Sequence, residues 1–462
     1  MPPNEKDVRQ NYEFQSRHYA PSPVDSLDPN HPIMPDIVVP PVYTIDLSLP
    51  PRERYTRVAA DYIETLRLLP PLFDEAIGLL NLPVKPCHVI ARLLFRRLYS
   101  FEQTQELKGI SEVCKVPMYL LVAFNVFIDA IMGCTSGGAV VNEPGSTETT
   151  MMHFRAFDWV HDSLRNAIAQ FEFVDKAGGE VIARTLGYVG QVGVLTGVRK
   201  GLSISLNCRP THNSSLMSAE RAEYYWNTLM VLLGRRRGIA TVLREYLLPR
   251  PVEEPKRRLR LFKRRKQEDE ESWISTTLLP AYGMDDVVNV LPTVRTSVAY
   301  LIFSTAAETV TLEKDILNAK IFRSSTFIVT GNHDASAEPG LHAYATEAPA
   351  TEARIKKLEL FAARRQELLD DSFERERDLL ERWQEWKEEQ ARERNEEKRG
   401  MSFARLLELI RFVPLISPDT HFLCVMDPRE GVFRWVERFP EGVVERQGKA
   451  YPEGAGKSGC VL

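Results

Sequence analysis

The pattern of apolar residues changes abruptly at Gly133. Upstream, apolar residues recur at helical spacing from residue 49 onward, and the last helical stretch is an apolar run at 117–132. Downstream, short strand-like segments are separated by turns that contain glycine or proline. A change from a period of about 3.6 residues to a period of two predicts a helical segment that leads into a sheet. Cys134 stands at the start of the first strand of that sheet.

The other predicted elements occur in blocks of one type. Strands are predicted at 40–47, 135–142, 149–158, 171–175, 181–186, 193–196, 202–207, 298–303, 309–313 and 326–331. Helices are predicted at 72–80, 89–100 and 217–248, with a highly charged helical region at 352–399 and a strand hairpin at 420–436. Such blocks predict an α+β fold. We expect the first group of strands to bring Cys134, Arg155 and Asn207 together at one edge of a sheet.

Composition narrows the class of protein. The 462 residues are 44% hydrophobic, enough for a sizeable core, and the net charge of −4 argues against a nucleic-acid partner. Six cysteines lie far apart without metal-type spacing, so we expect no disulfide framework, no metal and no cofactor. The start of the chain lacks a secretory pattern, and Asn125 and Asp129 interrupt its most apolar run. By default this predicts a cytoplasmic protein without a membrane span.

Changes in composition divide the chain into three parts. Residues 1–39 are polar and proline-rich, which predicts a flexible arm, 40–133 form the helical segment, and 134–462 form the larger domain. The larger domain contains a charged insertion at 251–271 as well as the charged helical region. We interpret the basic cluster at 256–266 as a solvated surface segment in preference to a nuclear-import or anionic-lipid patch.

Cys134 can act as a nucleophile only if a base removes its proton. The sequence has no familiar cysteine–histidine signature that would supply this base. A break between Gly133 and Cys134 would free an α-amino group, whose pKa of about 7.7–8.0 suits the task. Arg155 and Asp158 follow in the next predicted strand. Taken alone, this pair is more typical of an ordinary ion pair at a strand end.

Several stretches resemble one enzyme family in the same order along the chain. Residues 134–136 (Cys-Thr-Ser) and 154–158 (Phe-Arg-Ala-Phe-Asp) resemble the C-T-S … G-R-N-L-D-F segment of the acid ceramidase and N-acylethanolamine acid amidase family, which are N-terminal-nucleophile hydrolases. Residues 42–51 resemble the family's first strand, and residues 193–209 resemble its G-x-L-T-G … F-S-I-S-x-N-x-R run. Residues 330–334 resemble its T-N-Y-D motif, and residues 371–375 resemble a later Asp/Arg motif.

The resemblance implies a four-layer αββα sandwich preceded by the helical segment. It also implies a self-processing amidase that is cut between Gly133 and Cys134, with the two fragments held together as an α/β heterodimer in which 40–133 is the α part. The substrate would be an N-acyl lipid of the ceramide or N-acylethanolamine type, cleaved through a Cys134 thioester. By the same resemblance, Arg155 would be a cation beside the thiolate, Asp158 would hold the new ammonium group, and Asn332 would donate a hydrogen bond to the oxyanion. Arg375 would be a second arginine of the site, and Asn207 would bind substrate.

Alternatives remain for the residues and for the function. Asn332 is also typical of a turn, and Arg354 competes with Arg375 as the second arginine. An acyltransferase on the same scaffold would pass the acyl group to an amine. A non-catalytic binding protein would keep the fold and use 256–266 and 352–399 as contact surfaces. This alternative stays open because Phe154 and Ala156 replace the glycine and asparagine of the family segment and because 304–307 lacks the family's glycines. A lipid substrate would allow peripheral contact with a membrane.

Overall fold

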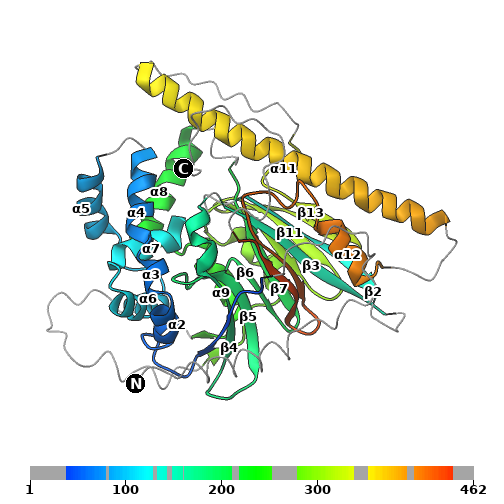
Figure 1. Cartoon of the computed structure of the whole chain (residues 1–462), viewed down its shortest axis with the longest axis horizontal. Coiled ribbons are helices and arrows are strands. Elements are labelled where there is room, and N and C mark those ends of the chain that lie inside the picture. Colours follow the sequence, from blue (N-terminus) through cyan, green and yellow to red (C-terminus); the bar gives the residue numbers. More distant parts are fainter. Residues whose placement is uncertain are drawn as a thin grey trace. The chain divides into compact units, whose positions relative to one another are not determined.

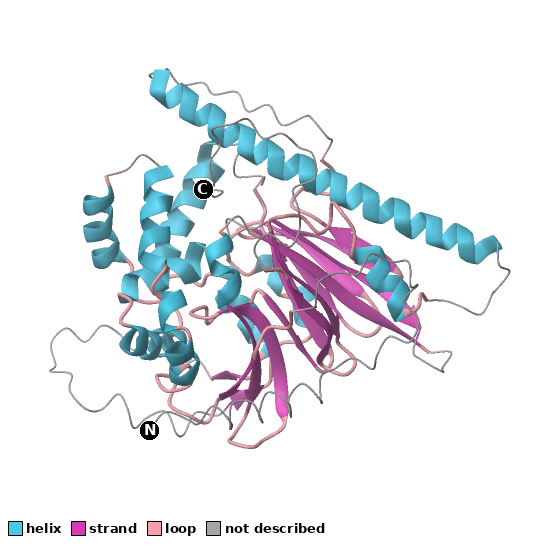
Figure 2. Cartoon of the chain, viewed as in Figure 1, coloured by secondary structure: helices cyan, strands magenta, loops and turns pink. Residues whose placement is uncertain are grey.

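The computed structural model describes residues 38–79, 83–127, 133–142, 148–159, 161–210, 218–251, 278–337, 352–392 and 400–440 (Figures 1 and 2). All of them belong to one unit, Val38–Leu462. Residues 1–37, which make up most of the predicted arm, and the basic cluster at 256–266 lie outside the described residues.

Two β-sheets organise the described chain (Figure 2). The larger sheet contains, in spatial order, β1 (Val42–Asp46), β4 (Ile168–Val174), β5 (Val181–Tyr188), β6 (Thr196–Arg199), β7 (Leu202–Asn207), β10 (Ala299–Ser304), β11 (Thr309–Lys314) and β12 (Ala319–Ser324). The smaller sheet contains β13 (Phe327–Thr330), β2 (Gly133–Asn142), β3 (Thr149–Asp158), β14 (Thr420–Asp427) and β15 (Val432–Arg438). β1 runs parallel to β4, whereas the other neighbours in both sheets are antiparallel. A separate pair of short strands joins β8 (Arg250–Pro251) to β9 (Leu278–Leu279).

Helices account for most of the remaining described structure. Those before Gly133 are α2 (Thr56–Asp61), α3 (Ile63–Leu66), α4 (Leu69–Leu79), α5 (Val84–Leu94), α6 (Phe101–Cys114) and α7 (Met118–Phe127). The later ones are α8 (Ser218–Leu232), α9 (Ile239–Leu247), α10 (Met284–Asn289), α11 (Glu352–Arg392) and α12 (Phe403–Ile410). Short 3₁₀ turns occur at Asp162–Ala167 and Leu291–Thr293.

Each sheet has its own set of covering helices. A buried apolar cluster joins the helices before Gly133, together with α9, to the larger sheet. A second cluster joins α11 and α12 to the smaller sheet. Along α11, the buried residues Leu369, Leu379, Trp383 and Trp386 recur at spacings that place them on one face, which is why this highly charged helix lies across β2 and β13 (Figure 1). The αββα sandwich is therefore confirmed.

Polar side chains connect the two sheets across their facing surfaces. His153 on β3 lies between two serine hydroxyls of β7, with Nδ1 2.9 Å from Ser203 Oγ and Nε2 2.8 Å from Ser205 Oγ. Gly138 on β2 leaves the space that Thr309 occupies, because a Cβ at Gly138 would lie 1.9 Å from Thr309 Oγ1. These hydrogen bonds, and the absence of a side chain at Gly138, let the two sheets approach closely at the middle of β2 and β3.

Some predicted elements differ from the structure. The strand predicted at 193–196 lies instead at Thr196–Arg199, and α5 ends at Leu94 although we predicted helix to residue 100. α6 and β12 were not predicted. The buried face of α6 includes Gln103 and Glu106, which hides its helical pattern, and β12 is an edge strand that is largely accessible to solvent. Asn207 lies in the larger sheet and Cys134 in the smaller one, so the expectation of a single sheet edge was wrong.

Candidate active site

Cys134 and Arg155 meet on the inner face of the smaller sheet. Strands β2 and β3 pair so that Cys134 lies opposite Phe157 and Ser136 opposite Arg155. Since side chains alternate along a strand, Cys134 and Arg155 project from the same face on neighbouring strands. Arg155 Nη2 lies 3.2 Å from Cys134 Sγ, and both residues are fully buried. The first two residues of the predicted site are therefore in direct contact.

The guanidinium of Arg155 is held by uncharged groups. It donates hydrogen bonds to the carbonyl oxygens of Leu195 and Leu206, and to Thr196 Oγ1 at 2.7 Å. Its carbon lies 5.0 Å from the centre of the Phe157 ring, in a cation–π arrangement. Within the described chain, no carboxylate forms an ion pair with Arg155. A buried cation of this kind stabilises an anion on the atom it touches, and that atom is Cys134 Sγ.

Two opposing influences act on the Cys134 thiol. Burial raises the pKa of the thiol above its ordinary value, because the thiolate would lose its hydration. The charge and the hydrogen bond of Arg155 oppose that rise, as does the more distant Arg375, whereas Asp158 adds to it. In the uncut chain, the balance of these influences keeps the pKa of the Cys134 thiol above its ordinary value.

Asn332 contacts the backbone nitrogen of the nucleophile. It follows β13, and its Oδ1 accepts a hydrogen bond from the Cys134 N–H at 2.9 Å. Its Nδ2 donates to the carbonyl oxygen of Cys208 at 2.7 Å. The amide therefore presents its oxygen to the atom that cleavage would turn into an α-amino group. In this arrangement the NH₂ group is engaged elsewhere, so the oxyanion role stays a prediction.

Asp158 lies beside the predicted cleavage point. It is the cross-strand partner of Gly133 at the end of β3. Arg375, from α11, donates a hydrogen bond to Asp158 Oδ2, and Thr420 Oγ1 donates to Oδ1 at 2.6 Å. Asp158, Arg375 and Thr420 are all buried, so the carboxylate is fixed in one orientation. The side chain of Arg354, the competing arginine, lies outside the described residues.

Asn207 approaches the same region from the larger sheet. Its Oδ1 accepts a hydrogen bond from Ser136 Oγ at 2.8 Å. Its Nδ2 donates to the carbonyl oxygens of Thr330 and Gly331 at 2.8 and 3.2 Å. These bonds connect β7 to β2 and β13. A role in substrate binding stays a prediction, because here the amide serves to join the two sheets.

The two departures from the family segment lie on the opposite face of β3. Phe154 and Ala156 are fully buried in the cluster that α11 and α12 cover. Gly137 makes room for the Phe154 ring, since a Cβ there would lie 2.7 Å from it. The ring of Phe154 stacks on Phe327 with centroids 6.2 Å apart. Phe154 and Ala156 therefore pack the sheet against its helices and lie on the face opposite to Cys134 and Arg155.

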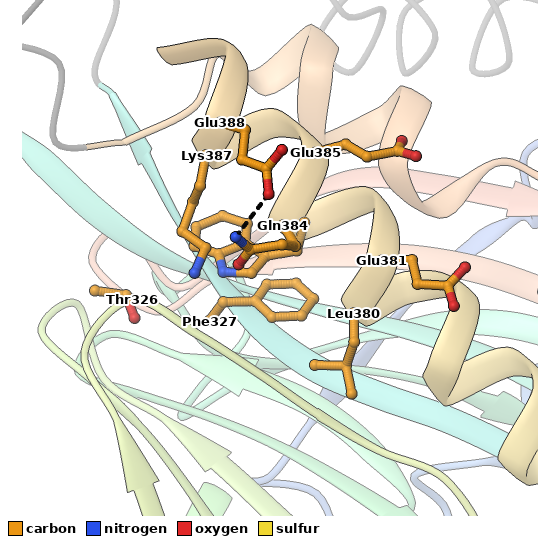
Figure 3. A pocket seen from close by; sticks show the side chains of 9 residues that line it. Thr326, Phe327, Leu380, Glu381, Gln384, Glu385, Lys387 and Glu388 are labelled. Atoms are coloured by element: carbon orange, nitrogen blue, oxygen red, sulfur yellow. Dashed lines mark hydrogen bonds between the residues drawn. The ribbon is translucent and has the colours of Figure 1, made fainter. Parts of the chain in front are cut away.

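The described cavities differ in their relation to this site. A groove of about 750 Å³ lies between α11 and the beginning of β13, where Leu380, Trp383 and Phe327 line it together with acidic residues of the helix (Figure 3). None of the predicted site residues lines this groove. An enclosed space of about 10 Å³, the size of one water molecule, is lined by residues that include Leu195 and Thr196, both partners of Arg155.

Within the described ranges, no group of three or more histidine, cysteine, aspartate or glutamate side chains could hold a metal ion. None of the described helices combines the length and the apolar character that crossing a bilayer requires.

Parts of the chain are similar in sequence to known proteins. Two facing sheets covered by helices, with a cysteine at the start of a central strand, form the arrangement of N-terminal-nucleophile hydrolases. A family model described as the beta subunit of N-acylethanolamine-hydrolyzing acid amidase matches residues 39–99. Over parts of its length, the chain therefore resembles the family that includes acid ceramidase and this amidase. The beta label of that description falls on the N-terminal part, which we had named α.

Individual relatives show how far the similarity extends. Acid ceramidase of Balaenoptera acutorostrata scammoni is 27% identical over 194 residues, which cover 38% of this chain and 47% of the relative. The Caenorhabditis elegans N-acylethanolamine-hydrolyzing acid amidase is 29% identical over 178 residues, or 36% and 47% of the two chains. A solved structure of the C. elegans ortholog of this amidase aligns with a TM-score of 0.41 and 19% identity over 66% of this chain and 100% of the other. The chain spans about half the length of the curated relatives it matches.

Sequence reasoning missed several residues that surround the site. Thr196 and Thr420 hold Arg155 and Asp158, and Ser372 accepts a hydrogen bond from the backbone N–H of Asn332 at 2.6 Å. Ser372 and Thr196 lie within stretches that resemble family motifs, at 371–375 and 193–209, and that resemblance was the available signal. Thr420 opens a strand, and nothing in its local sequence distinguishes it from other strand residues.

Proposed function

We propose that this protein is a self-processing amidase that uses Cys134 to hydrolyse the amide bond of an N-acyl lipid. The contact between the Cys134 thiol and the Arg155 guanidinium is the observation that carries the proposal. A buried cation surrounded by neutral acceptors favours the thiolate of an adjacent cysteine, which is the form that attacks a carbonyl. The relatives named acid ceramidase and N-acylethanolamine-hydrolyzing acid amidase indicate the class of substrate.

The first reaction would cut the chain itself. Cys134 Sγ attacks the carbonyl carbon of Gly133, the peptide C–N bond breaks, and the thiol proton ends on the departing nitrogen. Water then hydrolyses the resulting thioester, which gives Gly133 a carboxylate and returns the thiol to Cys134. Asp158 and Asn332 lie at the two sides of the bond that breaks, opposite Gly133 and against the Cys134 nitrogen.

The freed α-amino group would then serve as the base in turnover. It takes the thiol proton while Sγ attacks the carbonyl carbon of the N-acyl substrate. The amine leaves with that proton, and water releases the fatty acid from the thioester. Arg155 stabilises the thiolate, Asn332 orients the new amine, and its NH₂ group turns from Cys208 to the oxyanion. Asp158, held by Arg375, balances the positive charge of the ammonium form.

Exposed apolar side chains support contact with a lipid surface. On α5, Val89, Ile90 and Leu93 are 57%, 53% and 58% exposed, and on α8, Tyr225 and Trp226 are 65% and 54% exposed. Both helices pack against α7 (Figure 1). Aliphatic and aromatic side chains of this kind insert at the boundary between headgroups and acyl chains. Peripheral binding there would present an N-acyl lipid to the protein.

The test is to separate the purified chain on a denaturing gel and to identify the fragments by mass spectrometry. We expect two fragments, 1–133 and 134–462, and a single uncut chain for Cys134→Ala. Cys114→Ala is the matched control, because Cys114 is a buried free cysteine in α6 that takes no part in the proposal. A wild-type chain that stays intact at acidic and neutral pH, and that releases no fatty acid from N-acyl amides, would refute the proposed function.

Hydrolysis and acyl transfer differ in their products. Incubation with an added amine acceptor would leave the fatty acid as the main product of a hydrolase. A new N-acyl amine as the main product would instead assign the protein as an acyltransferase on the same scaffold.

A further inference from the structure

His333 connects the Asn332 loop to α11 through a chain of hydrogen bonds. Its Nδ1 lies 2.8 Å from Ser372 Oγ, and its Nε2 lies 2.9 Å from Glu376 Oε2. The ring stacks on Phe373, with centroids 3.8 Å apart. His333 and Ser372 are almost completely buried. None of these three partners of His333 contributes to the roles proposed so far.

The proton positions in this chain follow from its fixed end. The backbone N–H of Asn332 can only donate, so Ser372 Oγ accepts from it at 2.6 Å. The hydroxyl then has its own proton free to donate, and His333 Nδ1 is the acceptor beside it. This places the imidazole proton on Nε2, where it is donated to the Glu376 carboxylate. A single tautomer of His333 therefore satisfies every group in the chain.

The same helix also holds the other side of the predicted cleavage point. Ser372, Arg375 and Glu376 are three and four residues apart, so they lie on one face of α11. Arg375 bonds to Asp158, while Ser372 bonds to the backbone of Asn332. The loop approaches the helix very closely, since a Cβ at Gly331 would lie 2.2 Å from Ser372 Oγ. One rigid element thus fixes two of the residues that surround Cys134.

We propose that His333, Ser372 and Glu376 are positioning residues, which hold Asn332 at the orientation that self-cleavage and turnover require. The proposal rests on the proposed function and extends it to residues that do not touch Cys134. Histidine stands here where the resembling family motif has tyrosine. A tyrosine has one polar atom and cannot bridge a serine and a glutamate as the two imidazole nitrogens do. The chain of hydrogen bonds from Asn332 to Glu376 is therefore a feature of this sequence.

The experiment measures the self-cleavage rate, then kcat and KM of the cleaved protein, and the thermal midpoint, for four variants. Ser372→Ala removes the link to Asn332, and Glu376→Ala removes the partner that sets the His333 tautomer. Glu376→Gln keeps an oxygen that can accept from Nε2–H. Glu385→Gln makes the same change on an exposed part of α11 and serves as the control.

We expect Ser372→Ala and Glu376→Ala to slow self-cleavage about tenfold, because each removes a hydrogen bond worth about 1.4 kcal/mol to the alignment of Asn332. Turnover should fall in kcat with KM within about twofold, since Asn332 acts on the reacting atoms. Glu376→Gln should recover most of the loss, and Glu385→Gln should match the wild type.

Two kinds of result would overturn the positioning role. Wild-type rates in Ser372→Ala and Glu376→Ala would show that Asn332 needs no such support. A loss in Glu376→Gln as large as that in Glu376→Ala, or a loss that only follows the fall in thermal midpoint, would show a purely structural role. A wild-type chain that neither cleaves nor hydrolyses amides refutes the proposed function instead, so the two failures are distinguishable.

Discussion

Replacing Arg155 with methionine tests the central electrostatic argument. The variant removes the charge that lies 3.2 Å from Cys134 Sγ and keeps a side chain of similar length. At that distance, with an effective dielectric constant of about 20, the attraction between guanidinium and thiolate is about 5 kcal/mol. Water that enters the vacated space screens part of this loss, so we expect a net effect of about 3 kcal/mol, or about 100-fold in rate.

The assay follows self-cleavage on denaturing gels across a range of pH. Arg155 lowers the pKa of the Cys134 thiol against the opposing effect of burial, so its removal raises that pKa further. Less thiolate is then present at each pH below the pKa of the thiol, and the profile of cleavage rate against pH should move to higher pH. Arg323→Met, which removes an exposed arginine paired with Glu308, is the control and should leave the profile unchanged.

One outcome would refute this reasoning. If Arg155→Met folds with a normal thermal midpoint and cleaves at the wild-type rate with the same pH profile, the guanidinium does not stabilise a thiolate. If the variant fails to fold, Arg155→Lys decides the matter, because it keeps the charge and loses only the planar geometry. The lysine variant should then cleave faster than any folded neutral variant at that position.

Three further substitutions test the surroundings of the site. Asp158→Asn leaves buried Arg375 without its charged partner, and calorimetry should show a loss of about 3–5 kcal/mol in the free energy of unfolding. Thr420→Val removes one hydrogen bond to the Asp158 carboxylate, and gels should show self-cleavage slowed about tenfold while circular dichroism shows an intact fold. Burial lowers the pKa of His153 from 6.5 to about 3, so its charged form favours the unfolded chain. Stability should therefore fall by about 1.4 kcal/mol per pH unit as the pH drops from 6.5 to about 3, and chemical denaturation of His153→Gln should lack that component of the pH dependence.

The strands that carry the nucleophile were predictable because their pattern is local. The strand predictions at 149–158 and 202–207 coincide with β3 and β7, since both runs combine β-branched or aromatic residues with clear turns at their ends. α6 escaped detection for a reason that lies elsewhere in the chain. Its Glu106 is buried because Arg244, 138 residues away, pairs with it, and no local pattern indicates such a partner.

The strand pattern predicted that Cys134 and Arg155 would lie close together, whereas the more distant site residues were predictable only from the resemblance to a known family. Arg375 and Asp158 are 217 residues apart, and no spacing rule connects a helix to a strand over that distance. Asn207 and Cys134 lie on different sheets, so their relative position also depends on how the two sheets stack. Ser372 and His333 are 39 residues apart in the sequence, and Ser372 belongs to a highly charged helix.

Strand β1 has a consequence for what happens after a cut at Gly133. It precedes the cut, yet it forms the edge of the larger sheet beside β4, with Val42 opposite Gln170 and Asp46 opposite Val174. In an intact chain, β1 and β4 belong to one molecule, so the effective concentration of each strand near the other is high. A cut chain that unfolds must bring them together by collision. Folding would then depend on protein concentration, and a protein that assembles readily before the cut would recover poorly from denaturation after it.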